Sequence, residues 1–154
     1  MIIFRYRITD AMVCPDINGP IFDITITDEP KDNVKTIFSE KHYTHTIPQD
    51  AIEKIKSIIK KKPELLEIKE LEPNYQVLDG DIYEFIFSDG KKSTSFSGSN
   101  IMDYGSQPRK NATLAIRTAR TIKDQVLLNY HIRTMIPNRL QHWPDRHYIP
   151  KIKI

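Results

Sequence analysis

The sequence lacks most of what would mark an exported, disulfide-bonded or membrane-spanning protein. It has one cysteine, Cys14, among 154 residues, so an intrachain disulfide is excluded. The apolar run near its start is broken by Arg5 and Arg7 and is too short for the hydrophobic region of a signal peptide. No apolar stretch approaches the ~20 residues that a membrane-spanning helix needs. These absences predict a cytoplasmic location with no membrane partner.

Acidic side chains are scarce in the last third of the chain. Residues 105–154 hold 10 Lys and Arg against two acids, Asp124 and Asp145, and carry a net charge of +8. Residues 1–104 hold 13 Lys and Arg against 18 acids, a net charge of −5. This asymmetry indicates either an acidic partner for the basic third or a basic third that lies against the acidic remainder, where the two fields partly cancel.

The motifs of common catalytic sites are also missing. Cys14 precedes Pro15 in a turn-rich segment, with no identifiable partner that would activate its thiol. Neither G-x-S-x-G nor G-x-x-x-x-G-K-[ST] occurs, and Ser88 to Lys91 matches S-x-x-K only on a hairpin turn. We therefore expect a protein that binds rather than catalyses, with no cofactor.

Short segments that alternate apolar and polar residues are well represented. This pattern is typical of strands with one buried face. It occurs over residues 2–9, 22–28, 34–43, 83–89 and 91–97. Asp89-Gly90 is a tight-turn signal that joins the last two segments into a hairpin.

Two segments have helical periodicity. Residues 46–62 carry an isoleucine stripe, with Thr46 and Gln49 as an expected capping box, a lysine run at the end and Pro63 as the stop. Residues 111–132 carry a second apolar stripe. Residues 63–74 are expected to return as a short strand.

The order of these segments predicts an α+β fold in a single domain, 1–154. Two similar halves, 1–72 and 73–132, each read as a hairpin followed by a helix, which makes a ββα unit and suggests an internal repeat. The expected architecture is an antiparallel sheet with both helices on one face. A tail, 133–154, is expected to supply a C-terminal edge strand, with Pro150 at its start or at the sheet edge.

A candidate binding region combines the outer face of the second helix, the long loop before it and the basic tail. Arginine is favoured at interfaces because its planar guanidinium can bind at two points. We call this region the basic surface; its expected members are Met102, Tyr104, Arg109, Lys110, Arg117, Arg120, Arg139, Trp143 and Arg146.

Three functions are compatible with these residues. The first is docking of an acidic protein partner or of a second copy of this chain on the basic surface. The second is nucleic-acid binding through the same arginines, although no known nucleic-acid-binding module is present. The third is a metal-dependent hydrolase using His142, Asp145 and His147, whose irregular spacing argues against a helical metal site.

Overall fold

The computed structural model describes residues 1–9, 20, 22–38, 40–71, 82–99 and 110–136. These residues form an α+β fold with strands and helices in the following order. The elements are β1 (Ile2–Thr9), β2 (Phe22–Thr27), β3 (Val34–Phe38), β4 (Lys41–His45), α2 (Gln49–Lys60), the 3-10 turn η1 (Leu65–Glu67), β5 (Ile82–Ser88), β6 (Ser93–Ser99), α3 (Lys110–Gln125) and the 3-10 turn η2 (Leu127–Tyr130). No helix within these residues is long and apolar enough to cross a membrane.

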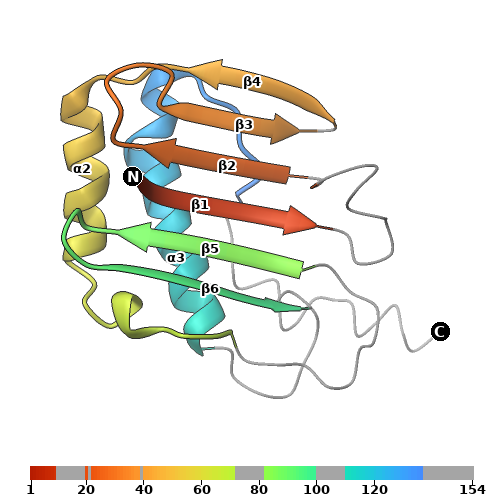
Figure 1. Cartoon of the computed structure of the whole chain (residues 1–154), viewed down its shortest axis with the longest axis vertical. Coiled ribbons are helices and arrows are strands. Elements are labelled where there is room, and N and C mark those ends of the chain that lie inside the picture. Colours follow the sequence, from red (N-terminus) through yellow and green to blue (C-terminus); the bar gives the residue numbers. More distant parts are fainter. Residues whose placement is uncertain (10–19, 21, 39, 72–81, 100–109, 137–154) are drawn as a thin grey trace.

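All six strands belong to one antiparallel sheet in the order β4-β3-β2-β1-β5-β6 (Figure 1). β1 lies in the interior of this sheet and pairs with β2 on one side and with β5 on the other. The ladder between β1 and β5 joins Phe4 to Phe87 and Tyr6 to Phe85. The first strand of the chain therefore connects the strands before α2 with those after it.

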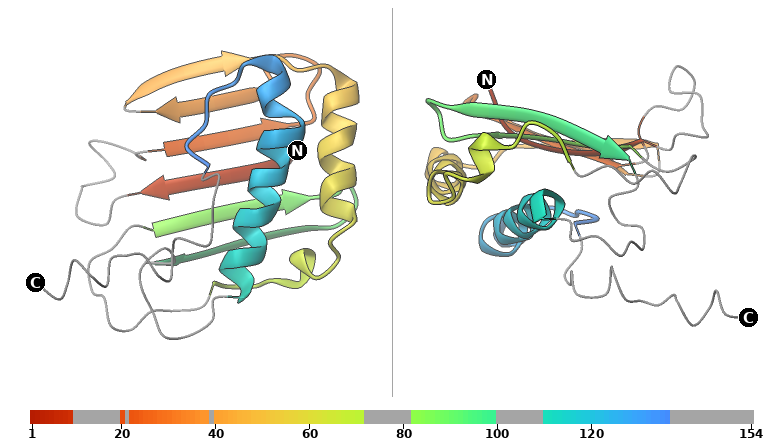
Figure 2. Two further views of the ribbon diagram at one scale, coloured as in Figure 1. Left: turned by 180° about the vertical axis from the view of Figure 1, so that it is seen from behind. Right: turned by 90° about the horizontal axis from the view of Figure 1, so that it is seen from below.

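The two helices lie on the same side of the sheet and cross the strands steeply (Figure 2). The side chains of Phe4, Tyr6 and Ile8 face them and are buried, whereas Arg5 and Arg7 face the opposite side and are only partly buried. The alternation predicted for residues 2–9 is thus observed from Phe4 onward, whereas at the start of the strand, where the register with β2 shifts, Ile3 is fully buried and Ile2 only partly. The core beneath the helices is rich in aromatic rings; Tyr6 and Phe85, for example, stack with centroids 4.6 Å apart.

One segment that the sequence predicts as a single strand forms two strands of the sheet. Residues 34–43 were expected as one strand, but β3 ends at Phe38 and a turn at Glu40, which has a left-handed φ of 68°, begins β4. Among the described residues, four strands therefore precede α2 and two lie between α2 and α3, so the described parts of the two halves differ in strand count from two like ββα units.

The first helix begins differently from the expected capping box. Its N-cap is Pro48, with no side-chain capping hydrogen bond. Thr46 is used elsewhere, since its hydroxyl accepts a hydrogen bond of 2.9 Å from the Asp32 backbone N–H. The Gln49 side chain donates to the Glu29 carbonyl at 3.3 Å. Both residues predicted to cap the helix thus bind the β2–β3 turn.

The second helix ends earlier than predicted. α3 stops at Gln125, η2 follows, and His131 adopts a left-handed conformation with φ 59°. The chain then turns back toward the core, where Ile132 and Ile136 are 1% and 3% exposed. The expected helix over residues 111–132 is therefore a helix, a 3-10 turn and a packed extended segment.

Residues 63–71 form η1 and a segment beside β6 instead of the expected strand. The Leu71 N–H donates to the Ser97 carbonyl at 3.2 Å, and the Thr94 hydroxyl donates to the Ile68 carbonyl at 2.6 Å. These bonds cover part of the outer edge of β6. Cys14 and the expected C-terminal strand lie outside the described residues.

Candidate binding surface

Three predicted members of the basic surface lie within the described part of the chain. Lys110 and Arg117 are exposed on α3, and Arg120 on the same helix is partly buried. The other predicted members lie outside the described residues: Met102, Tyr104, Arg109, Arg139, Trp143 and Arg146. The structure therefore tests the helical part of this surface only.

α3 turns its small and branched residues inward and its arginines outward. Ala112, Ala115 and Ala119 are fully buried, which allows the helix to lie close to the sheet. Arg117 lies at the opposite side and is exposed. Within the described residues its guanidinium has no ion-pair partner, so its charge is available to a binding partner.

Lys62, just after the end of α2, adds a positive charge next to those of α3. Burial lowers the pKa of Lys62 from its usual value, Glu64 opposes this shift, and the charges of Arg117 and Arg120 lower it further. Such mutual repulsion requires that the groups be close together. The basic surface therefore includes the C-terminal end of α2, a member that sequence reasoning missed.

Lys123 on the same helix has a structural role. Its side chain is buried, and Nζ donates a hydrogen bond of 2.8 Å to the Ile136 carbonyl. Burial lowers its pKa, an effect that Asp124 opposes and Arg120 increases. Lys123 thus ties the segment after η2 to α3 and is not part of the exposed basic surface.

Apolar side chains lie at the far end of α3 from Lys110. Leu128 and Tyr130 on η2 are 52% and 40% exposed, and Met135 is 48% exposed. Leu114, by contrast, is partly buried and packs against the core. Exposed apolar groups beside arginines are typical of interfaces between proteins.

A hollow of about 390 Å³ opens beside the first turn of α3. One wall comes from Lys110, Asn111 and Leu114, and the other from residues 64 to 70, including Glu64 and Glu67. The Asn111 side chain joins the walls through a 3.3 Å bond to the Glu70 carbonyl. The charge of this hollow is mixed, because Lys69 and Lys110 line it together with three glutamates.

The sheet face opposite the helices is polar and internally bonded. The Arg7 Nε donates to the Asp23 carboxylate at 2.5 Å, and the Arg5 Nε donates to the Thr25 hydroxyl at 2.9 Å. Thr25 in turn donates to Asp23 at 2.7 Å. This network fixes both arginines against β2.

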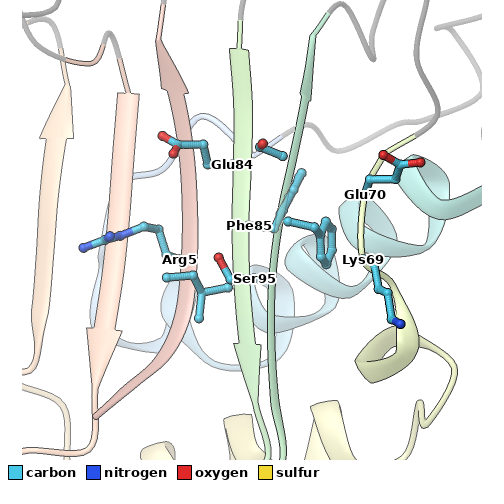
Figure 3. Close-up of a pocket in the computed structure, with 9 residues that line it drawn as sticks. Arg5, Lys69, Glu70, Glu84, Phe85 and Ser95 are labelled. Carbon is cyan, nitrogen blue, oxygen red and sulfur yellow. The ribbon is translucent and has the colours of Figure 1, made fainter.

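A second hollow, of about 400 Å³, lies over β5 and β6 on this face. Figure 3 shows that Arg5 and Glu84 on its rim lean away from it, toward β2 and β1 respectively, and that Lys69 points outward. The charged ends of these side chains therefore do not converge on a common point. The hollow has the size of a small-ligand site but lacks the convergent polar groups of one.

The described residues contain no group of three potential metal ligands. The sequence-predicted ligands His142, Asp145 and His147 lie outside them. No family model, no curated protein and no solved structure matches the chain.

Proposed function

We propose that the protein is a non-catalytic binding protein that docks an acidic protein partner on its basic surface. The support for this proposal is the exposed Arg117 on the outer side of α3, together with Arg120 and with Lys62 after the end of α2, whose pKa both arginines lower. Lys62 follows α2 and the two arginines lie on α3, and the charges of both arginines repel that of Lys62 in the unbound protein. A carboxylate-rich partner would relieve that repulsion, so binding would favour anions at this point.

An acidic partner suits this surface better than a second copy of the chain does. A two-fold symmetric contact places the same patch of both copies in the interface. Arg117 would then approach the like-charged patch of the other copy, and such juxtaposition costs affinity. Self-association through the basic surface remains the less favoured form of the proposal.

A titration with a glutamate-rich peptide tests the proposal. The double variant Arg117→Ala with Arg120→Ala should weaken binding at least about tenfold, equivalent to ~1.4 kcal/mol. Lys35→Ala is the matched control, because Lys35 is exposed on β3, on the sheet face without helices, and should leave affinity unchanged. Equal affinities for the wild type and the double variant would exclude this surface.

Nucleic-acid binding through the same arginines is the competing outcome. The same titration with single-stranded and duplex oligonucleotides at two salt concentrations separates the two functions. Binding to phosphates weakens steeply and linearly in log salt, because bound counterions are released. Tight oligonucleotide binding with that salt slope, together with weak peptide binding, would replace the protein partner by a nucleic acid.

A further inference from the structure

We propose that the outer edge of β4 pairs with the β4 edge of a second copy of this chain. The two sheets would then form one continuous antiparallel sheet around a two-fold axis. This inference is independent of the proposed function, because it uses the opposite end of the sheet from β6 and none of the residues of the basic surface.

The two edges of the sheet differ in how they are covered. The outer edge of β6 is bonded to the segment that contains Ile68 and Leu71, because Ser97 accepts from Leu71 and the Thr94 hydroxyl donates to Ile68. β4 is the other terminal strand, and no other strand of the described residues pairs with its outer edge. An uncovered edge presents unpaired N–H and C=O groups, which are a template for another strand.

The side chains of β4 are also less covered than those of the neighbouring strands. Tyr6, Ile24, Thr36 and Tyr43 form one cross-strand row on the helix-facing side of β1, β2, β3 and β4. Their exposed fractions are 0%, 0%, 5% and 47%. Phe38, in the neighbouring row, is also 38% exposed. The helix-facing side of the sheet is buried at β1 and β2. Near the β4 edge it carries two exposed aromatic side chains, Phe38 and Tyr43.

The sequence of β4, KHYTH, complements itself when paired antiparallel about Tyr43. Tyr43 then lies opposite Tyr43 of the other copy, on the side that the helices leave open. Lys41 lies opposite His45, and His42 opposite Thr44, so this register places neither two lysines nor two carboxylates opposite each other. Cross-strand aromatic pairs stabilise antiparallel ladders.

β4 carries few of the features that protect edge strands from pairing. It contains neither proline nor glycine, and its single charged residue, Lys41, is at one end. Natural edges are usually blocked by proline, bulges or inward-pointing charges. The edge is short, so we expect a small interface and association in the micromolar range.

Sedimentation equilibrium from low micromolar to submillimolar protein should show a monomer–dimer equilibrium. Tyr43→Glu places two carboxylates opposite each other and should raise the dissociation constant at least about tenfold. Tyr130→Glu is the matched control, because Tyr130 is similarly exposed (40%) but lies on η2. Circular dichroism of each variant confirms that the fold is retained.

A mixing experiment tests the register itself. Tyr43→Glu and Tyr43→Lys should each be monomeric alone, and an equimolar mixture should recover dimers through a glutamate–lysine pair. Recovery requires that position 43 of one copy meets position 43 of the other. The proposal is overturned if the wild type stays monomeric, whether the edge is free or occupied by the chain's own predicted C-terminal strand. It is equally overturned if Tyr43→Glu dimerises like the wild type, or if the mixture stays monomeric.

Discussion

Asn33 forms a two-point hydrogen bond with the backbone of Ile47. The Asn33 side-chain oxygen accepts from the Ile47 N–H at 2.8 Å, and its amide nitrogen donates to the Ile47 carbonyl at 2.9 Å. Both residues are fully buried. The Asn33 amide therefore forms the two hydrogen bonds that the backbone of a neighbouring strand would form, and it holds the chain just before α2 against the start of β3.

Asn33→Ala should lower the free energy of unfolding by roughly 2–4 kcal/mol, because it leaves two buried backbone groups of Ile47 unpaired. Urea denaturation measures the change. Gln49→Ala removes an exposed bond of 3.3 Å to the nearby Glu29 carbonyl and should cost less than about 0.5 kcal/mol. Similar losses in the two variants would show that the Asn33 bridge is unimportant.

Tyr6→Phe should stabilise the protein by about 1 kcal/mol. Tyr6 is fully buried, and its hydroxyl has no hydrogen-bond partner within the described residues. Burial, and to a smaller extent the charge of Tyr83, raises the pKa of Tyr6 above its usual value of 10.0.

The gain from Tyr6→Phe should grow as the pH rises above 10.0, the ordinary value. There the unfolded tyrosine loses its proton while the folded one keeps it, so the wild type loses stability with rising pH and the phenylalanine variant loses less. Thermal unfolding of both proteins at neutral and alkaline pH provides the comparison. A pH-independent difference between them would contradict the raised pKa of Tyr6.

Arg117→Gln should raise the pKa of Lys62 toward its usual value, because it removes one of the repelling charges. A side-chain NMR titration of Lys62 measures the pKa directly. Arg133→Gln provides the control; Arg133 is exposed on the segment after η2 and does not contribute to the shift of Lys62. An unchanged pKa in Arg117→Gln would place the two groups apart and weaken the proposed binding surface.

Asp23→Ala should lower the free energy of unfolding by about 2–3 kcal/mol. The Asp23 side chain is 4% exposed, and its removal leaves the Arg7 guanidinium without its ion-pair partner. The cost falls below the ~3–5 kcal/mol of fully buried pairs because the Arg7 side chain is 31% exposed. Chemical denaturation of Asp23→Ala and of Asp23→Ala with Arg7→Met separates the two effects, since the double variant should recover part of the loss.

The central strands of the fold are predictable from sequence because their alternation is regular. Ile24 and Ile26 of β2 face the core, whereas Asp23 and Thr25 lie on the other face of the sheet, as their spacing predicts. β4 cannot be predicted from alternation, because an edge strand that is exposed on both sides needs no apolar face. Its separation from β3 depends on the turn at Glu40, whose left-handed conformation is not typical of glutamate.

The ends of the helices were less predictable because tertiary contacts decide them. The expected cap Thr46 is bound by Asp32, fourteen residues earlier in the chain. Likewise, α3 stops at Gln125 so that Leu127, Ile132 and Ile136 can enter the core. No local pattern in the sequence encodes either contact.

The candidate site was predictable in part. The outward position of Arg117 follows from helical periodicity alone. Lys62 joins it only because the end of α2 lies near the middle of α3, and this depends on the packing of two helices that are about fifty residues apart in sequence. If consecutive helices are assumed to run antiparallel, the lysine run at the end of α2 is predicted to lie near the arginines of α3.

The interior position of β1 sets the order in which the fold can be completed during synthesis. β1 is synthesised before the other described strands, yet its second ladder requires Ile82 to Phe87. In a ribosome-bound chain that ends before these residues, β1 can pair with β2, but the edge of β1 that faces β5 stays unpaired. β1 is thus among the last strands to be paired on both sides. Its pairing with β5 closes a long loop, which makes this folding step intrinsically slow.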